Sequence, residues 1–359
     1  MTNALREAES LGLDTVQIFT KNQQQWHAKP LTDSAVRAWL DELNRLGWRD
    51  RTVSHASYLA NLASPDDTLW ERSIALMIEE IERCEALSIP FLVHHPGAFT
   101  SSTREAGLAR IAAAYARLLR ATPGFRTVCC LEGTVGAGTQ LGGTLDDLAD
   151  LRRLILDLTP QPERVGFCLD TCHLHASGED LSTSVAAADL LRRFDHACGL
   201  PNLRVVHLND SKGACGSHLD RHEHIGQGTV GGSPQRLAES GFAVFVNHPA
   251  LRDVPKILET PKGVHNATPW DSINLQRLKS LLTTPARSKS PAASLASRPS
   301  TTPAKAKAKR VAKDKARSKP PSRSLGLAEE RSVKRTSVSP KQKPARRKLG
   351  VENPPRKGR

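Results

Sequence analysis

The sequence of 359 residues lacks any run of about 18 or more apolar residues, which excludes a transmembrane helix of ordinary length. Its first ten residues, MTNALREAES, contain neither the basic nor the apolar segment of a secretory signal, so we expect none here. The seven cysteines are odd in number and follow no repeat, which argues against a disulfide scaffold and fits a reducing compartment. These absences exclude collagen, coiled coils and small secreted disulfide proteins.

The formal net charge of +14 is distributed unevenly along the chain. Residues 285–359 hold 23 Lys and Arg against four Asp and Glu, a net charge of +19. Residues 1–284 hold 28 basic and 33 acidic residues, a net charge of −5. The chain therefore divides into a mildly acidic body, residues 1–284, and a strongly basic tail, residues 285–359.

The tail contains no Phe, Trp or Tyr, and it holds ten of the 23 prolines. Because such a composition cannot bury enough apolar surface to offset the entropy of ordering, we predict a disordered segment rich in Lys, Arg, Pro, Ser and Ala. Clustered Lys and Arg favour binding to DNA phosphates without sequence preference, and a solubilising extension is the alternative. Without aromatic residues to stack on bases, the tail has no means of specifying a site.

In the body, short β-branched or apolar runs alternate with segments of helical periodicity. Clear helices are predicted over residues 69–86 and 104–121. The predicted strands are residues 15–19, 52–53, 91–93, 128–131, 165–169, 203–206 and 256–258. Strands that alternate with helices predict βαβ units and a parallel sheet. Seven of them over about 280 residues indicate an α/β fold, a TIM-type (β/α)8 barrel that lacks one strand.

A His, Asp or Glu stands just past the end of six of the seven predicted strands. These residues are His55, His95, Glu132, Asp170, His207 and Glu259. The carboxyl ends of barrel strands form the face that carries chemistry, and carboxylates are costly to bury together unless cations compensate them. The pattern therefore predicts a metal site.

Two short motifs extend the set of predicted ligands to nine. Asp170-Thr-Cys-His173 adds His173, and Asp220-Arg-His222 adds Asp220 and His222. Five imidazoles and four carboxylates suit zinc, with manganese or iron less favoured. Nine ligands are too many for one ion, and three divalent ions against four carboxylates would leave a positive site suited to a phosphate group.

Six stretches of the body resemble a known family. They are residues 19–26 (FTKNQQQW), 55–62 (HASYLANL), 94–97 (HHPG), 166–173 (GFCLDTCH), 206–228 (VHLNDSKGACGSHLDRHEHIGQG) and 257–263 (ILETPKG). In this order they resemble endonuclease IV, the family 2 apurinic/apyrimidinic endonucleases of DNA base-excision repair, whose members hold three zinc ions. The resemblance spans residues 14–270.

The resemblance implies a zinc-dependent deoxyribonuclease IV-type hydrolase that cleaves the phosphodiester 5′ to an abasic site and leaves a 3′-hydroxyl and a 5′-deoxyribose phosphate. It implies that Glu132 and Glu259 are catalytic, as metal ligands around the attacking hydroxide. The implied ligands are His55, His95 and Glu132 for the first ion, Asp170, His207 and Glu259 with the bridging Glu132 for the second, and His173, Asp220 and His222 for the third.

The implied partner is double-stranded DNA with abasic or damaged sites. The resemblance places Tyr58 inside the duplex at the lesion, with Leu59 beside it, and an ordinary loop aromatic is the alternative. Lys212 and Arg221 are expected to contact phosphates, with solvated charges as the alternative. We expect a monomer without membrane contacts, in the cytoplasm with the nucleoid if the source is bacterial or in the nucleus if it is eukaryotic.

The family's first strand and its Gly-rich loop have no counterpart ahead of residues 3–11. The favoured explanation is that the protein's true start lies upstream of this sequence. The alternative is a truncated barrel with exposed edges.

Two other functions stay open at this point. One is a sugar-isomerase-like barrel, which would need only two metals and no DNA-binding tail. The other is a DNA-binding protein with impaired catalysis.

Overall fold

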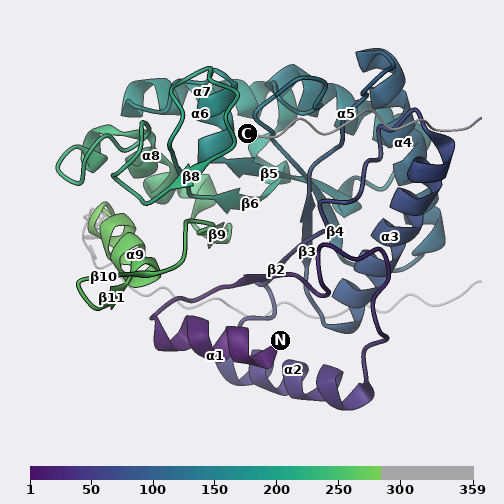
Figure 1. Ribbon diagram of the computed structural model, residues 1–359, viewed down its shortest axis with the longest axis horizontal. Coiled ribbons are helices and arrows are strands. Elements are labelled where there is room, and N and C mark those ends of the chain that lie inside the picture. Colours follow the sequence, from purple (N-terminus) through teal and green to yellow (C-terminus); the bar gives the residue numbers. More distant parts are fainter. Residues whose placement is uncertain (284–359) are drawn as a thin grey trace, which may run out of the picture. The chain divides into compact units, whose positions relative to one another are not determined.

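The computed structural model describes residues 1–283, so the prediction of a disordered tail over residues 285–359 lies outside the described residues. Seven parallel strands form one sheet in the order β1-β2-β3-β4-β5-β6-β9 (Figure 1). The strands are β1 Gln17–Ile18, β2 Val53–His55, β3 Phe91–His94, β4 Val128–Glu132, β5 Val165–Asp170, β6 Leu203–His207 and β9 Lys256–Ile257. The predicted TIM-type barrel with seven strands is confirmed.

The strands at the two edges of this sheet are shorter than the sequence predicted. The strand predicted over residues 15–19 is reduced to Gln17–Ile18, and the one over residues 256–258 to Lys256–Ile257. Each edge strand has one neighbour in the sheet, β2 for β1 and β6 for β9, and the paired length covers two residues. The inner strands β3, β4, β5 and β6 each gain one residue at the carboxyl end, because the ladder with the next strand includes it. His94 pairs with Leu131, Glu132 with Cys168, Asp170 with His207, and His207 with Ile257.

Two antiparallel ribbons stand apart from the main sheet. One pairs β7 (Asp210–Ser211) with β8 (His222–Glu223), and the other pairs β10 (Val264–His265) with β11 (Thr268–Pro269). The helices are α1 Thr2–Ser10, α2 Asp33–Leu46, α3 Asp67–Ala86, α4 Arg104–Ala121, α5 Leu145–Leu158, α6 Thr171–Ser177, α7 Ser184–Cys198, α8 Gly241–Asn247 and α9 Trp270–Ser280. The short 3₁₀ helices are η1 Pro162–Arg164, η2 Leu200–Asn202, η3 Leu237–Glu239 and η4 Pro249–Leu251.

Most of the long helices begin after a side chain that caps them. Thr32, Thr103, Thr144 and Thr183 each accept a hydrogen bond from the backbone N–H three residues further on, at the starts of α2, α4, α5 and α7. Asp66 does the same for α3, which therefore begins before the predicted residue 69. Helix α4 has the bounds that periodicity predicts.

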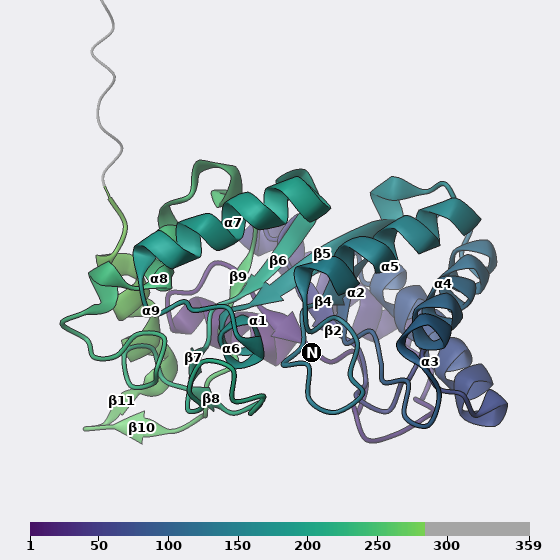
Figure 2. The same cartoon turned by 90° about the horizontal axis from the view of Figure 1, so that it is seen from above.

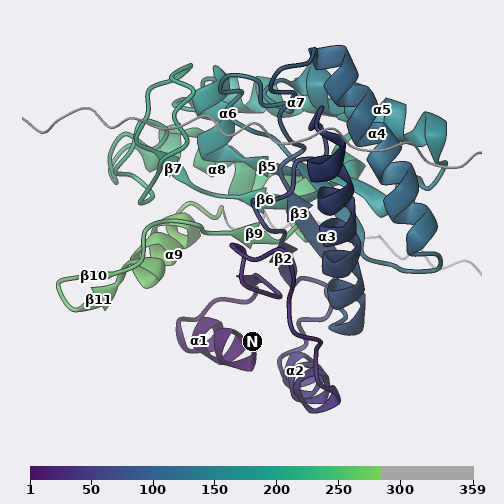
Figure 3. The same ribbon diagram turned by 45° about the vertical axis from the view of Figure 1, so that its right-hand side comes forward.

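The helices cover the outer face of the sheet and leave its inner face to a second, smaller core. Figure 2 shows α3, α4, α5 and α7 along the outside of the strands, and Figure 3 shows α1 beside α2, where Arg6 Nε lies 3.1 Å from Glu42 Oε1. The outer core includes the fully buried rings of Trp39, Tyr115 and Phe167. No helix within residues 1–283 is long and apolar enough to cross a lipid bilayer.

Candidate metal centre

Six of the nine predicted ligands lie in one layer at the carboxyl end of the barrel. Residues two apart on a strand point to the same side of the sheet. The inner core is one apolar layer, made by Val53, Val93, Cys130, Cys168, Val205 and Ile257. The residues two positions further along these strands are His55, His95, Glu132, Asp170, His207 and Glu259. The barrel therefore places a polar layer directly above an apolar one.

The remaining three predicted ligands come from the segments that follow β5 and β6. Asp170 begins α6 as its N-cap, because its Oδ1 accepts hydrogen bonds from the backbone N–H groups of Cys172 and His173. This geometry turns His173 toward the site while Oδ2 of Asp170 also faces it, 3.6 Å from His222 Nε2. The spacing of the Asp-Thr-Cys-His motif is thus that of a capped first helical turn.

The segment that follows Asp220 and His222 is held by a buried carboxylate. Oδ2 of Asp210 accepts a hydrogen bond from the N–H of Gly226, and Oδ1 accepts one from Val230, at 2.8 and 3.0 Å. A Cβ added at Gly231 would lie 2.6 Å from Asp210 Oδ2, so only glycine permits this approach. After β8, the chain thus folds back around Asp210, which holds the segment that directly follows His222.

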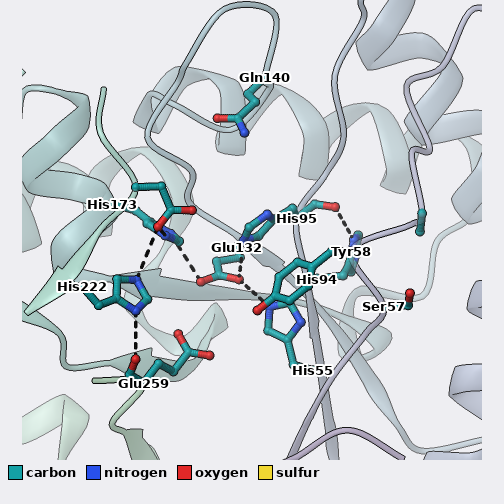
Figure 4. Close-up of a pocket in the computed structure, with 12 residues that line it drawn as sticks. His55, Ser57, Tyr58, His94, His95, Glu132, Gln140, His173, His222 and Glu259 are labelled. Carbon is teal, nitrogen blue, oxygen red and sulfur yellow. Dashed lines mark hydrogen bonds and ion pairs between the residues drawn. The ribbon is translucent and has the colours of Figure 1, made fainter. Parts of the chain in front are cut away.

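The side chains surround a cavity of about 350 Å³ (Figure 4). Among residues 1–283, five groups have ligand atoms within 4.8 Å of one another; two of them include Cys168 or Cys172, and the other three consist of predicted ligands alone. These three are His55, His95 and Glu132; Glu132, Asp170, His207 and Glu259; and His173, Asp220 and His222. The structure therefore brings all nine predicted ligands together, in the three sets that the resemblance implied.

The chemistry of these groups fits divalent cations. Nε2 of His222 is buried and has no hydrogen-bond partner among the described residues, although Asp170 and Asp220 oxygens lie 3.6 and 3.7 Å away. An unpaired buried nitrogen is costly unless something else binds it. A cation between His222 and these carboxylates would satisfy the nitrogen and both oxygens.

The buried carboxylates and imidazoles of this cluster shift one another's pKa values. Burial disfavours the charged form of Glu132, yet the imidazoles of His207 and His95 hold its pKa well below its usual range. Burial also opposes protonation of His173, but Asp170, together with Asp220 and Glu132, raises the pKa of His173 to about 10. The lowered pKa of Glu132 and the raised pKa of His173 both show that the buried carboxylates are stabilised by positive charge nearby.

The predicted DNA-contacting residues take different positions around this mouth. Tyr58 lines the cavity with 57% of its surface exposed, and its ring centroid lies 4.9 Å from that of His55. Leu59, Lys212 and Arg221 do not line the cavity. Lys212 and Arg221 are exposed on the ribbon segment, where Lys212 Nζ lies 3.7 Å from Glu223 Oε2.

Two amide side chains at the site were missed by the sequence reasoning. Asn209 is fully buried, its Nδ2 donates to Asp170 Oδ2 at 2.6 Å, and its Oδ1 accepts from the N–H of Glu259 at 2.7 Å. Gln17 contacts His207 and Glu259 from β1. The position of Asn209 two residues after His207 could have indicated it, whereas nothing local to Gln17 connects it with ligands about 190 residues or more away.

His94 and Tyr115 form a buried pair behind the candidate ligand His95. Nε2 of His94 lies 2.6 Å from the Tyr115 hydroxyl, and its Nδ1 lies 2.9 Å from the carbonyl oxygen of His95. Burial lowers the pKa of His94 to about 4, so this ring is neutral. It therefore accepts from Tyr115 and donates to the backbone at His95.

Comparisons with known proteins identify the family to which this barrel belongs. Residues 5–281 match the family described as xylose isomerase-like TIM barrel. A probable endonuclease 4 of Chloroflexus aurantiacus is 44% identical over 282 residues, which cover 79% of this chain and 94% of that protein. The crystal structure of endonuclease IV from Thermus thermophilus is similar with a TM-score of 0.66 and 33% identity, covering 78% of this chain and 93% of that one.

A D-tagatose 3-epimerase-like protein, 16% identical with a TM-score of 0.56, shares the fold; the match covers 78% of this chain and 92% of that one. The barrel and the layer of imidazoles and carboxylates at its mouth thus define a metal-dependent enzyme of the xylose isomerase-like class. Within that class, the chain belongs to the endonuclease IV family.

Proposed function

We propose that this protein is a zinc-dependent apurinic/apyrimidinic endonuclease of DNA base-excision repair, which cleaves the phosphodiester 5′ to an abasic site. The observation that carries the proposal is the convergence of three ligand groups on one cavity in a member of the endonuclease IV family. A two-metal sugar isomerase would leave the group of His173, Asp220 and His222 without a role.

Each group would hold one zinc ion, and Glu132 belongs to both the first and the second group. Bound divalent ions lower the pKa of water and neutralise charge on a phosphate, so no side chain is needed as a general base. The protein's own part is to orient the ligands: Asp170 is fixed by the helix it caps, and Glu259 by the amide of Asn209. Four carboxylates against three divalent ions leave a positive site for the scissile phosphate.

The exposed ring of Tyr58 supports a role for this residue at the lesion. It stands at the mouth of the cavity against Phe19 and His55, with ring centroids 5.9 and 4.9 Å apart. A ring in this position can fill the gap left in a base stack when an abasic nucleotide leaves it, and such a nucleotide costs least to extrude. Leu59, Lys212 and Arg221 would add contacts around it.

The tail is proposed to bind DNA without sequence preference. The body carries a net charge of −5, so the net charge of +19 in residues 285–359 is the larger source of long-range attraction to the duplex. We propose a monomer that acts where DNA is held, which is the nucleoid-containing cytoplasm of a bacterium or the nucleus of a eukaryote.

Incision of a duplex with one tetrahydrofuran abasic analogue tests the function. The full chain with zinc should cut the strand 5′ to the analogue and leave a 3′-hydroxyl, and removal of metal should abolish cutting. A duplex without the lesion is the control. Binding of the lesion duplex without cutting would identify a DNA-binding protein with impaired catalysis, and metal-dependent epimerisation of ketoses instead of cutting would identify a sugar isomerase.

A further inference from the structure

We infer that Gln17 is a positioning residue for the second metal group. Gln17 fixes the proton of His207 on Nε2, and it holds Glu259 across the open side of the barrel. The inference rests on the metal binding proposed above. Neither the sequence motifs nor the ligand groups include Gln17, which is half-buried in the edge strand β1.

The two hydrogen bonds of the Gln17 amide join opposite edges of the sheet. Its Nε2 donates to Glu259 Oε1 at 2.6 Å, and its Oε1 lies 2.9 Å from Nε2 of His207. Glu259 follows β9, the other edge strand, and no ladder joins β1 to β9 within residues 1–283. At the mouth of the barrel, the Gln17 side chain thus connects β1 with the end of β9, whereas backbone pairing connects the other neighbouring strands.

The chemistry of the partners determines how this amide is oriented. An ionised carboxylate can only accept hydrogen bonds, so the amide nitrogen must face Glu259 and the amide oxygen must face His207. Because that oxygen can only accept, Nε2 of His207 must carry a proton. A cation can therefore bind this ring only through Nδ1.

Nδ1 faces the second metal group, where a cation would take the place of the proton that Nδ1 donates to the carboxylates. Nδ1 of His207 lies 2.9 Å from Glu132 Oε1 and 3.1 Å from Glu259 Oε2. Imidazole binds a metal through its unprotonated nitrogen, and the partner of the other nitrogen sets which one that is. Gln17 therefore prepares His207 to bind through Nδ1, and at the same time it orients one oxygen of Glu259.

Zinc affinity of the full chain tests this role directly. We expect Gln17→Leu, which removes both hydrogen bonds at similar size, to weaken binding of one of the three zinc ions by about 10- to 100-fold. The other two ions should bind as in the unsubstituted protein, since Gln17 contacts neither the first group's histidines nor the third group. Competition with a chromophoric chelator measures the three affinities. Gln276→Leu, at an exposed glutamine of α9, is the matched control.

A second variant separates positioning from general damage to the fold. Gln17→Glu keeps an acceptor for His207 Nε2–H but places a carboxylate against Glu259. In zinc-loaded protein labelled with ¹⁵N-histidine, the hydrogen-bonded Nε2–H signal of His207 should persist in this variant and shift upfield in Gln17→Leu. The affinity for the same ion should fall in both variants.

Three tightly bound ions in Gln17→Leu, or an unshifted His207 signal, would overturn the role of Gln17. If Gln17→Leu does not fold, the ¹⁵N signal and the zinc affinity of Gln17→Glu test the role of Gln17 instead. A persistent His207 signal together with unchanged zinc affinity in Gln17→Glu would also overturn that role. Failure of the unsubstituted protein to bind three ions would instead contradict the proposed function. The two failures are therefore distinguishable.

Discussion

The Nδ1 atom of His207 lies 2.9 Å from Oε1 of Glu132, and both side chains are almost completely buried. Oε2 of the same carboxylate lies 3.1 Å from His55 Nε2 and 3.3 Å from His95 Nε2. Glu132 thus faces histidines of two metal groups at once. A buried carboxylate with imidazoles on both of its oxygens is placed to bridge two cations.

Replacing Glu132 by Gln should remove metal and activity together. The amide of Gln has an NH₂ group in place of one carboxylate oxygen, and this group cannot bind a metal ion. One or two of the three ions should therefore be lost. Because a catalytic ion is worth several kcal/mol, single-turnover incision should fall by about 10³-fold. Elemental analysis and incision kinetics measure both effects, with Glu163→Gln on the exposed η1 as control. Retained cleavage with full metal content would refute the assignment.

The metal-stripped protein should lose stability as the pH rises from about 6.5 to 10. Despite its burial, His173 has its pKa raised from an ordinary 6.5 to about 10, chiefly by Asp170. A group with a pKa raised by folding stabilises the fold fully below its unfolded value and ceases to do so above its folded value. Melting temperatures from calorimetry across this range should fall, and His173→Asn should show less of the fall. Equal curves for the two proteins would contradict the prediction.

Removal of the Tyr58 ring should weaken lesion recognition without unfolding the protein. The side chain is 57% exposed, so little core packing is lost. Stacking of an aromatic ring on a base is worth about 1–3 kcal/mol, so Tyr58→Ala should weaken binding to an abasic duplex by about tenfold or more. Fluorescence anisotropy with abasic and intact duplexes measures this, and Tyr58→Phe should bind like the unsubstituted protein. Equal affinity of the Ala variant would argue that the ring stays outside the duplex.

Deletion of residues 285–359 should flatten the salt dependence of DNA binding. The tail holds 23 of the 51 Lys and Arg residues, and each phosphate contact that is lost lowers the slope of log affinity against log salt by about 0.9. Binding titrations between low and physiological salt measure the slope. Incision at saturating DNA should be unchanged, because all nine candidate ligands lie in the body. An unaltered slope would exclude the tail from DNA binding.

Asp210→Asn should loosen the segment that directly follows Asp220 and His222 of the third metal group. The substitution places an amide N–H₂ near backbone donors such as Gly226 and Val230, and a buried donor without its acceptor costs about 1–3 kcal/mol. We expect a loss of stability of that order and weaker binding of one zinc ion. Denaturant titration and chelator competition measure these, with Asp41→Asn on the exposed face of α2 as control. Unchanged zinc affinity despite lost stability would show that the loop is held by other contacts.

The candidate ligands could be predicted because their signal is local. Each of His55, Glu132 and Asp170 ends a β-branched or apolar run, and the two-residue period of a strand determines which side it faces. His173 was predictable because the turn after Asp170 is a capped helix start. The lengths of β1 and β9 were wrong, since propensity does not show how many neighbours a strand has.

By itself, the sequence determined the barrel, the layer of ligands at its mouth and the division into an acidic body and a basic tail. Only the tertiary structure decided what holds those ligands. Curling of the sheet brings β1 near β9 and sets Gln17 against His207 and Glu259, although 242 residues separate Gln17 from Glu259. Local patterns establish which face a residue occupies, whereas contacts between distant strands depend on how the sheet curls around its core, which no short segment encodes.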